Sequence, residues 1–286
     1  MVASIRDIRR RIKSVDSTSQ ITKAMKLVAT AKMQKARRNL EETRPFFNKM
    51  KSSISSIVNG SKGITHPYLR EREVKKTMYI VMTSDRGLAG GYNINVSRLA
   101  LQHMKKKENL EVITVGRRAR DYFSRRAYTI HDSYLGISEE PKYFHAARIG
   151  EIVLELYKKQ EIDEVYLVYT AFKSTINQEP EIMKLLPVDI SDFGEAQNKR
   201  AALMDYEPSP EGVLDYVIPK YIKSVIFGAM VESAASEQGA RMTAMDSATE
   251  NAKDIIERLT VQYNRARQAE ITQEITEIVG GSEALK

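Results

Sequence analysis

The sequence of 286 residues contains no cysteine, which excludes disulfide bonds and thiolate metal sites. Its four histidines are scattered, with no two of them three or four residues apart, and this spacing argues against a zinc site. The patterns G-x-S-x-G and H-E-x-x-H, which mark two classes of hydrolase, are also missing. We therefore expect no metal, no cofactor and no catalytic residue in this chain.

Long apolar runs are missing as well. No stretch reaches the about 18 apolar residues that are needed to span a bilayer. The first residues, MVASIRDIRRRIK, are basic, but no apolar stretch follows them. The sequence therefore predicts neither a transmembrane segment nor a secretory signal.

Proline and glycine are absent from residues 1–44 and again from residues 240–279. Apolar residues recur every three or four positions in both stretches, which is the pattern of one apolar helix face. In the first stretch these residues are Ile5, Ile8, Ile12 and Val15, followed less strictly by Ile21, Met25, Val28, Met33, Ala36 and Leu40. Each end of the chain is therefore predicted to form one long helical segment.

The expected bounds follow from turn residues. We place the N-terminal helix over residues 1–58, with Pro45 opening a second helical segment and Asn59-Gly60 stopping it. The C-terminal helix covers residues 212–286 and is expected to end at Gly280-Gly281 as a C-cap. At 1.5 Å per residue the two helices would be about 80 and about 105 Å long.

The two ends carry opposite charge. Residues 1–51 hold 14 Lys and Arg against 4 Asp and Glu, whereas residues 200–286 hold 9 against 14. Oppositely charged helices attract each other when they lie side by side, and a long helix needs a partner for its apolar face. We therefore predict an antiparallel coiled coil of the two terminal helices.

The middle of the chain alternates short strands with helices, which predicts an inserted Rossmann-like α/β domain with a mostly parallel sheet over residues 75–190. Polar, turn-rich residues 191–211 are expected to form a linker. The expected strands are 78–83, 112–115 and 165–170, with 182–187 pairing to the last, and the expected helices are 93–106, 117–126 and 143–159.

The predicted C-terminal helix outruns its partner by roughly 15 residues at 1.5 Å each. The overhang carries an apolar face, Ile271, Ile275, Ile278 and Val279, that nothing else in the chain is expected to cover. Two interpretations stand beside each other: a frayed terminus, or a tip that inserts into an apolar socket on another protein.

Two further motifs also allow two interpretations. The glycine-containing loop 84–91 follows a strand and precedes a helix, as a phosphate loop would, but it matches neither common nucleotide pattern, so a tight turn is favoured. The basic cluster Arg9–Arg11 with Lys13 could bind nucleic acid, but no aromatic platform or zinc finger accompanies it, so a charged helix face is favoured.

The last 22 residues, RARQAEITQEITEIVGGSEALK, resemble the C-terminal signature of the gamma subunit of the rotary, F-type ATP synthase, of the bacterial type. Ile271, Thr272, Glu274, Glu277 and Gly281 match that signature, and Ser282 replaces its usual alanine. Further similar stretches are IRDIRRRIKSV and ITKAMKLVATAKM near the start, SDRGLAGGYN at 84–93, Tyr206-Glu207-Pro208 and SEQGARMTAM at 236–245.

The resemblance implies a non-catalytic rotor shaft of the proton-translocating enzyme. It implies that the helical pair turns inside a ring of three alpha and three beta subunits that hold the catalytic sites. It also implies contacts of the α/β domain with the epsilon subunit and the membrane c-ring. No nucleic acid is expected as a partner. The implied location is peripheral, on the cytoplasmic side of the inner cell membrane. Direction of turnover, inhibition by epsilon, size of the c-ring and the choice of H⁺ or Na⁺ stay open.

The resemblance also implies roles for single residues. It implies contact and coupling with the beta subunit for the following residues: Met25, Arg241, Arg267, Gln268, Thr272 and Glu274. For Met25 a place in the helical seam is an equally good interpretation. Tyr206 and Glu207 match a foot region near the c-ring, and the four apolar residues of the overhang match the shaft tip.

Overall fold

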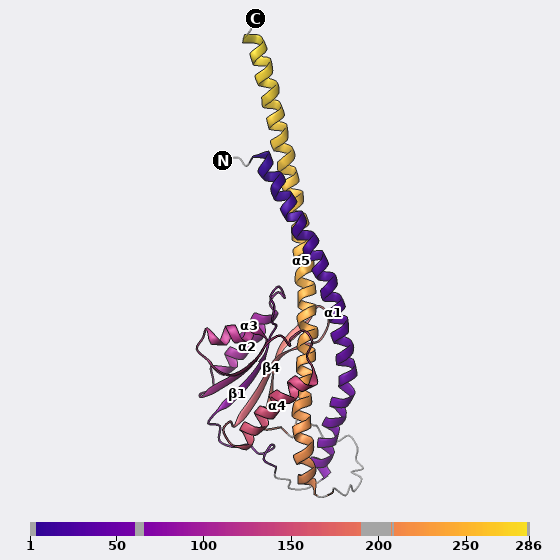
Figure 1. Cartoon of the computed structure of the whole chain (residues 1–286), viewed down its shortest axis with the longest axis vertical. Helices are drawn as coiled ribbons and strands as arrows, with labels where there is room; N and C mark the ends of the chain where they lie inside the picture. The colour runs from indigo at the N-terminus through magenta and orange to yellow at the C-terminus, as the bar shows by residue number, and fades with distance from the viewer. Residues whose placement is uncertain (1–3, 61–65, 190–206, 208, 285–286) are drawn as a thin grey trace. The chain divides into compact units, whose positions relative to one another are not determined.

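A computed structural model describes residues 4–60, 66–189, 207 and 209–284 (Figure 1). The chain begins with helix α1 (Ile5–Gly60) and ends with helix α5 (Pro210–Ala284). Between them lie, in chain order, β1 (Thr77–Met82), α2 (Tyr92–Met104), β2 (Leu110–Val115), α3 (Arg117–Ser124), β3 (Thr129–Tyr134), α4 (Tyr143–Lys158), β4 (Glu164–Phe172) and β5 (Gln178–Leu186). The predicted fold class, two long terminal helices with an inserted α/β domain, is confirmed.

The chain divides into two compact units. Unit 1 is Met1–Ala29 with Met242–Lys286, and unit 2 is Thr30–Arg241. Both long helices therefore contribute residues to both units. The predicted domain boundaries at residues 58, 75, 190 and 211 stay predictions, and most of the predicted linker lies outside the described residues.

Unit 1 consists of two helices that run antiparallel. Thr22 Oγ1 lies 2.7 Å from Thr249 Oγ1, and Lys26 Nζ lies 2.5 Å from Asp246 Oδ1. From Thr22 to Lys26 the residue number rises along α1, while the number of the α5 partner falls from Thr249 to Asp246. The buried seam is made of small and polar residues as much as of large apolar ones: Ile8, Thr22, Ala29, Met245, Thr249 and Ala252. Within this unit α5 continues past the start of α1 (Figure 1).

Two predicted helix breaks are absent. Pro45 lies inside α1, where the sequence pattern predicts a new segment. Its ring removes one backbone hydrogen bond from α1, and its side chain is exposed. The predicted C-cap at Gly280-Gly281 is also wrong, since α5 runs through both glycines to Ala284 and neither adopts a positive φ.

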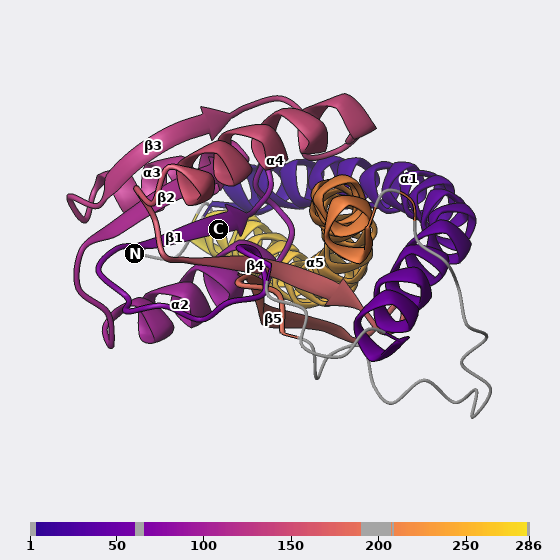
Figure 2. The ribbon, with the colours of Figure 1, turned by 90° about the horizontal axis from the view of Figure 1, so that it is seen from below.

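The sheet of unit 2 has the strand order β3-β2-β1-β4-β5. The first four strands in this order pair in parallel, and β5 pairs antiparallel with β4, Val168 opposite Ile182. Seen end-on in Figure 2, α4 and α5 lie on one side of the sheet and α2 on the other. The predicted pairing of residues 182–187 with residues 165–170 is confirmed in β4 and β5.

Alternation along the strands builds two cores. Met78, Ile80 and Met82 of β1 join the apolar faces of α4 and α5 in one cluster. Tyr79 and Val81 point the other way and pack with α2 and α3. The two clusters make unit 2 a three-layer α/β structure.

The strand β3 is a feature that the sequence pattern misses. Its six residues, TIHDSY, contain a single aliphatic side chain, and none of them is fully buried. This composition reflects its place at the edge of the sheet, where one long side faces away from the core.

The described helices include none that is long and apolar enough to cross a membrane.

Candidate functional site

Unit 1 exposes large aliphatic side chains along both of its helices. On α5, every described side chain from Arg267 to Ser282 is exposed. The apolar residues there, Ile271, Ile275, Ile278 and Val279, are 42%, 57%, 72% and 55% exposed. They recur at helical spacing, so they form one continuous apolar face that no described residue of this chain covers. Clusters of this kind are typical of a surface that binds another protein.

A second apolar stripe lies on α1. Ile21 and Val28 were expected in the seam, but they are 60% and 56% exposed, and the seam passes instead through Thr22 and Ala29. The difference arises because the helix turns its small residues toward α5. Met25 lies between Ile21 and Val28 at spacings of four and three residues and is half-buried. Both interpretations of Met25, seam and partner contact, are therefore compatible with its position.

The predicted coupling residues of the overhang lie together on one exposed helical segment. Arg267, Gln268, Thr272 and Glu274 are all exposed. The Thr272 hydroxyl donates to the Gln268 carbonyl at 2.8 Å, a bond within its own helix. Of the two predicted foot residues, Glu207 is exposed, and Tyr206 lies outside the described residues.

Arg241 lies in unit 2 and is buried. Its guanidinium Nη2 lies 2.6 Å from Glu237 Oε1 and donates to the Gly87 carbonyl at 3.4 Å. Glu237 has no exposed surface at all. Burial raises the pKa of the Glu237 carboxyl, and the neighbouring Arg241 offsets part of this effect. The structure thus places Arg241 in a charge pair inside the chain rather than at its surface.

The loop 84–91 lies between β1 and α2, and its first two backbone N–H groups are bonded: Ser84 N donates to Asn93 Oδ1 at 2.9 Å and Asp85 N to Ser138 Oγ at 3.0 Å. The backbone N–H groups at the start of α3, the helix that follows β2, lie against the same loop and are a second natural anion site. They are already used, because Arg117 N donates to Asp85 Oδ1 at 3.1 Å, Arg118 N to the Ser84 carbonyl at 3.1 Å, and Ala119 N to Thr83 Oγ1 at 2.7 Å. Burial acts to raise the pKa of Asp85, but hydrogen bonds from the backbone of Gly136, Ser138 and Arg117 hold it below its ordinary value.

Gly116 allows the turn before α3 to approach the backbone of Thr83 closely. Its φ is +90°, and an added Cβ would lie 2.2 Å from the Thr83 carbonyl oxygen. Only glycine fits there, so the Val115-Gly116-Arg117 motif serves the turn between β2 and α3.

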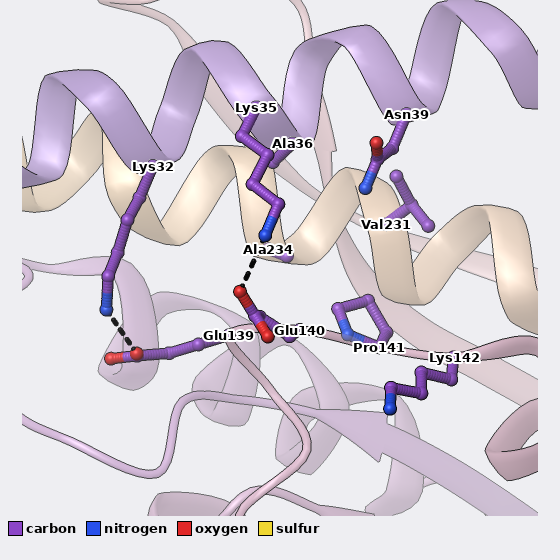
Figure 3. Close-up of a pocket in the computed structure, with 10 residues that line it drawn as sticks. All are labelled: Lys32, Lys35, Ala36, Asn39, Glu139, Glu140, Pro141, Lys142, Val231 and Ala234. Atoms are coloured by element: carbon purple, nitrogen blue, oxygen red, sulfur yellow. Dashed lines mark hydrogen bonds and ion pairs between the residues drawn. The ribbon is translucent and has the colours of Figure 1, made fainter.

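A pocket of about 190 Å³ lies between α1, α5 and the loop that precedes α4 (Figure 3). Its lysines reach the loop: Lys32 Nζ lies 2.6 Å from Glu139 Oε2 and Lys35 Nζ 2.8 Å from Glu140 Oε1. Because carboxylates already neutralise these two cations, the pocket is poorly suited to an anionic ligand. Among the described residues there is also no group of His, Asp and Glu that could hold a metal ion.

Comparison with known proteins agrees with the architecture over the full length. The family model described as ATP synthase matches residues 4–285. The ATP synthase gamma chain of Alkaliphilus metalliredigens is 53% identical over 289 residues, covering all of both chains. The chain belongs to the ATP synthase gamma chain family. Its function is accordingly that of the rotor subunit in the central stalk of the enzyme.

Further relatives extend this family assignment. The gamma chain of Acetobacterium woodii, named as sodium ion specific, is 50% identical over 301 residues and also covers both chains completely. A central-stalk structure of the Tetrahymena thermophila mitochondrial ATP synthase is 28% identical, with a TM-score of 0.60, covering 80% of this chain and 99% of that one. A chain of the Euglena gracilis mitochondrial enzyme shares the fold with a TM-score of 0.68 at 20% identity, covering 98% and 94%.

The polar residues of α5 that meet the sheet were not predicted as a site. Ser233, Ser236 and Glu237 are buried against the ends of the strands. The i, i+4 spacing of Glu237 and Arg241 was visible in the sequence, but such pairs are common on exposed helix surfaces. No sequence signal could show that this helix face packs onto a sheet.

Proposed function

We propose that the chain transmits torque between a membrane c-ring and a surrounding ring of three alpha and three beta subunits. The beta subunits, rather than this chain, would carry out ATP synthesis or hydrolysis. The exposed aliphatic residues along both helices of unit 1 carry this proposal. Paired helices normally bury such residues, and here they remain available to an enclosing partner.

Within this proposal, Ile271, Ile275, Ile278 and Val279 turn inside an apolar sleeve formed by the partner ring. The same stretch of α5 makes polar contacts with a beta subunit, through Arg267, Gln268, Thr272 and Glu274. Exposed polar and charged contacts of this kind contribute about 0–1 kcal/mol each, so they can break and re-form with each step of rotation. Met25 contacts the beta subunit from the stripe on α1.

The other proposed partners of the chain, besides the alpha and beta subunits, are the epsilon subunit and the c-ring. The Tetrahymena relative comes from a structure of the central stalk with the c-ring, and this likeness supports the same partner here. Tyr206 and Glu207 would form the foot that faces the ring. The chain would then be peripheral to the cell membrane on its cytoplasmic side.

The experiment that tests this function is co-expression of the tagged chain with the alpha and beta subunits of the same organism, followed by purification. We expect a complex that hydrolyses ATP and in which the chain rotates in single-molecule measurements. The double variant Ile275→Asp with Ile278→Asp should lower recovery of the complex, because it places two charges in the apolar sleeve.

The matched control is Ile176→Asp. Ile176 lies in the loop between β4 and β5, is 83% exposed and plays no part in the proposed sleeve. Recovery of the complex should be unchanged. The proposal would be rejected if the wild-type chain purified without alpha and beta subunits, or if the tip variant assembled and rotated as the wild type does.

A further inference from the structure

The sheet of unit 2 has a site where folds of this class bind ligands, and the chain itself fills it. In the order β3-β2-β1-β4-β5, the chain runs outward from β1 to β3 and then returns to β4 on the other side of β1. The carboxyl ends of β1 and β4 therefore flank a topological switch point, where open α/β sheets form their ligand crevice.

The segment 233–241 of α5 lies over this crevice and bonds to both of its walls. On the β4 side, Ser236 Oγ donates to the Thr170 carbonyl at 3.1 Å, and Thr170 N donates to Ser233 Oγ at 3.4 Å. From the segment after β1, the Tyr92 hydroxyl donates to the Ser233 carbonyl at 3.1 Å, and Arg241 donates to the Gly87 carbonyl. All of these contacts lie within unit 2.

The buried face of α5 changes in character along the sheet. Large apolar side chains, Ile222, Ile226 and Met230, pack into the core shared with β1, β4 and α4. From Ser233 onward the buried residues are small or polar: Ser233, Ala234, Ala235, Ser236, Glu237 and Gln238. Small residues give shallow ridges, which fix the rotation of a helix less firmly than interdigitating large side chains do. Over the crevice, directional polar contacts therefore add to the register that the larger residues set.

Glu237 and Arg241 are suited to that task. The pair is 0% and 8% exposed at its side chains, and Glu237 Oε2 has no hydrogen-bond partner among the described residues. A buried ion pair is a weak source of stability, because desolvation of the two charges opposes their attraction. Its best-attested use is to specify one register, since any other register leaves a charge buried without its partner.

We propose that Glu237 and Arg241, together with Ser233 and Ser236, form a register lock that holds α5 at a fixed rotation against the sheet of unit 2. The lock would deliver torque from the α/β part of this unit to the helix without slippage. Glu237 acts as a positioning residue, because it holds the Arg241 guanidinium against the Gly87 carbonyl. This inference rests on the proposed function as a torque-transmitting shaft.

The test replaces the charge pair by an apolar pair of similar size, Glu237→Met with Arg241→Met, in the complete membrane-bound complex. Two readouts are compared: the thermal midpoint of the purified chain, and the ions pumped per ATP hydrolysed in inverted membrane vesicles. We expect an unchanged or higher midpoint, near-normal ATP hydrolysis and a several-fold fall in pumping per ATP. A merely structural role would instead change the midpoint and the recovery of the complex.

A control pair joins the same helix to α4. Lys223 Nζ lies 2.7 Å from Glu151 Oε1 of α4, and the Glu151 side chain is 65% exposed. Lys223→Met with Glu151→Met should leave pumping per ATP unchanged. Arg241→Lys, which keeps a charge pair with Glu237, should retain most of the coupling.

If the apolar pair prevents folding, Ser233→Ala with Ser236→Ala removes two of the polar contacts without adding volume, and a smaller fall in pumping per ATP is expected. Normal pumping in a stably folded apolar-pair or serine variant would overturn the register lock. Failure of the proposed function is a separate outcome, because the wild-type chain would then fail to support pumping or to join the complex.

Discussion

The sheet of unit 2 and the helices of unit 1 differ in how far they bury their apolar side chains. In unit 2, the large side chains of β1 and β2 are almost completely buried between helices, and backbone donors at the start of α3 are bonded within the chain. In unit 1, helices of the same chain expose Ile21, Val28 and the apolar residues of the tip. The strands of unit 2 thus bury their apolar residues within the chain, whereas the helices of unit 1 carry apolar faces that no described residue of the chain covers.

The largest effect should come from the closest approach inside unit 2. Gly116→Ala places a Cβ 2.2 Å from the Thr83 carbonyl oxygen at a φ of +90°. Strain of about 1–3 kcal/mol for the left-handed conformation and about 1–3 kcal/mol for overpacking should both apply. We expect a matching fall in the free energy of unfolding, measured by urea denaturation of the full chain.

Gly136→Ala is the control for this substitution. Gly136 also has a positive φ, +75°, but an added Cβ would meet nothing within 4 Å. Only the conformational cost of about 1–2 kcal/mol should remain. Equal losses for the two variants would show that the contact between Gly116 and Thr83 does not limit stability.

A matched pair of isoleucines tests the comparison of the two units directly. Ile80 is 0% exposed in the central strand β1, and Ile278 is 72% exposed on α5. Ile80→Ala should lower the free energy of unfolding by about 2–5 kcal/mol, since it leaves a cavity in the core. Ile278→Ala should change it by less than about 0.5 kcal/mol while weakening assembly with the alpha and beta subunits.

Both values come from denaturation of the full chain, and assembly is followed by recovery of the complex. A large loss of stability in Ile278→Ala would mean that the tip is covered by this chain after all. The two units would then not differ in the way that the exposed residues indicate.

The same contrast explains which features the sequence predicts. Buried strands such as β1 and β4 are recognised in the sequence by unbroken apolar runs. The terminal helices are recognised by the three-to-four-residue spacing of their apolar residues and by the absence of proline and glycine. The edge strand β3 has no such run, so its pairing depends on a neighbour that local patterns do not contain. The α5 face around Ser233 and Glu237 looks like an ordinary helix surface, because its burial is decided by tertiary packing alone.

The seam of unit 1 shows a subtler limit. Heptad spacing selects Ile21 and Val28 by their size, but the helices meet through Thr22 and Ala29 instead. A hydrophobicity pattern assumes that the largest residues are buried within the chain. It cannot recognise a helix whose larger apolar residues are left for another protein.

A smaller effect should come from Asp85, which ties the loop 84–91 to α3 and to the residues before α4. Its carboxylate accepts from Arg117 N at 3.1 Å and from Ser138 N at 3.2 Å. Hydrogen bonds to a charged group contribute about 1.5–3 kcal/mol, and we expect Asp85→Asn to cost the lower end of this range because the carboxyl is only half-buried.

The pKa of Asp85 is lowered in the folded chain, so its stabilising effect is present above the ordinary aspartate pKa of about 4 and is lost as the pH falls through the lower folded value. The difference in unfolding free energy between wild type and Asp85→Asn should therefore shrink from neutral to acidic pH. Urea titrations at several pH values measure it. A difference that does not change with pH would assign the effect to geometry rather than to charge.

The smallest effect concerns the tip of unit 1, where Gly280 and Gly281 continue the helix. Both glycines have open space around them, with nothing within 4 Å of an added Cβ. Alanine is favoured over glycine inside a helix by about 0.5–1 kcal/mol, so Gly281→Ala should slow amide hydrogen exchange in the last turns of α5. A left-handed C-cap at Gly281, as the sequence pattern predicts, would give the opposite sign, because alanine is strained at a positive φ. The direction of the change therefore decides whether the exposed tip is a continuous helix before any partner surrounds it.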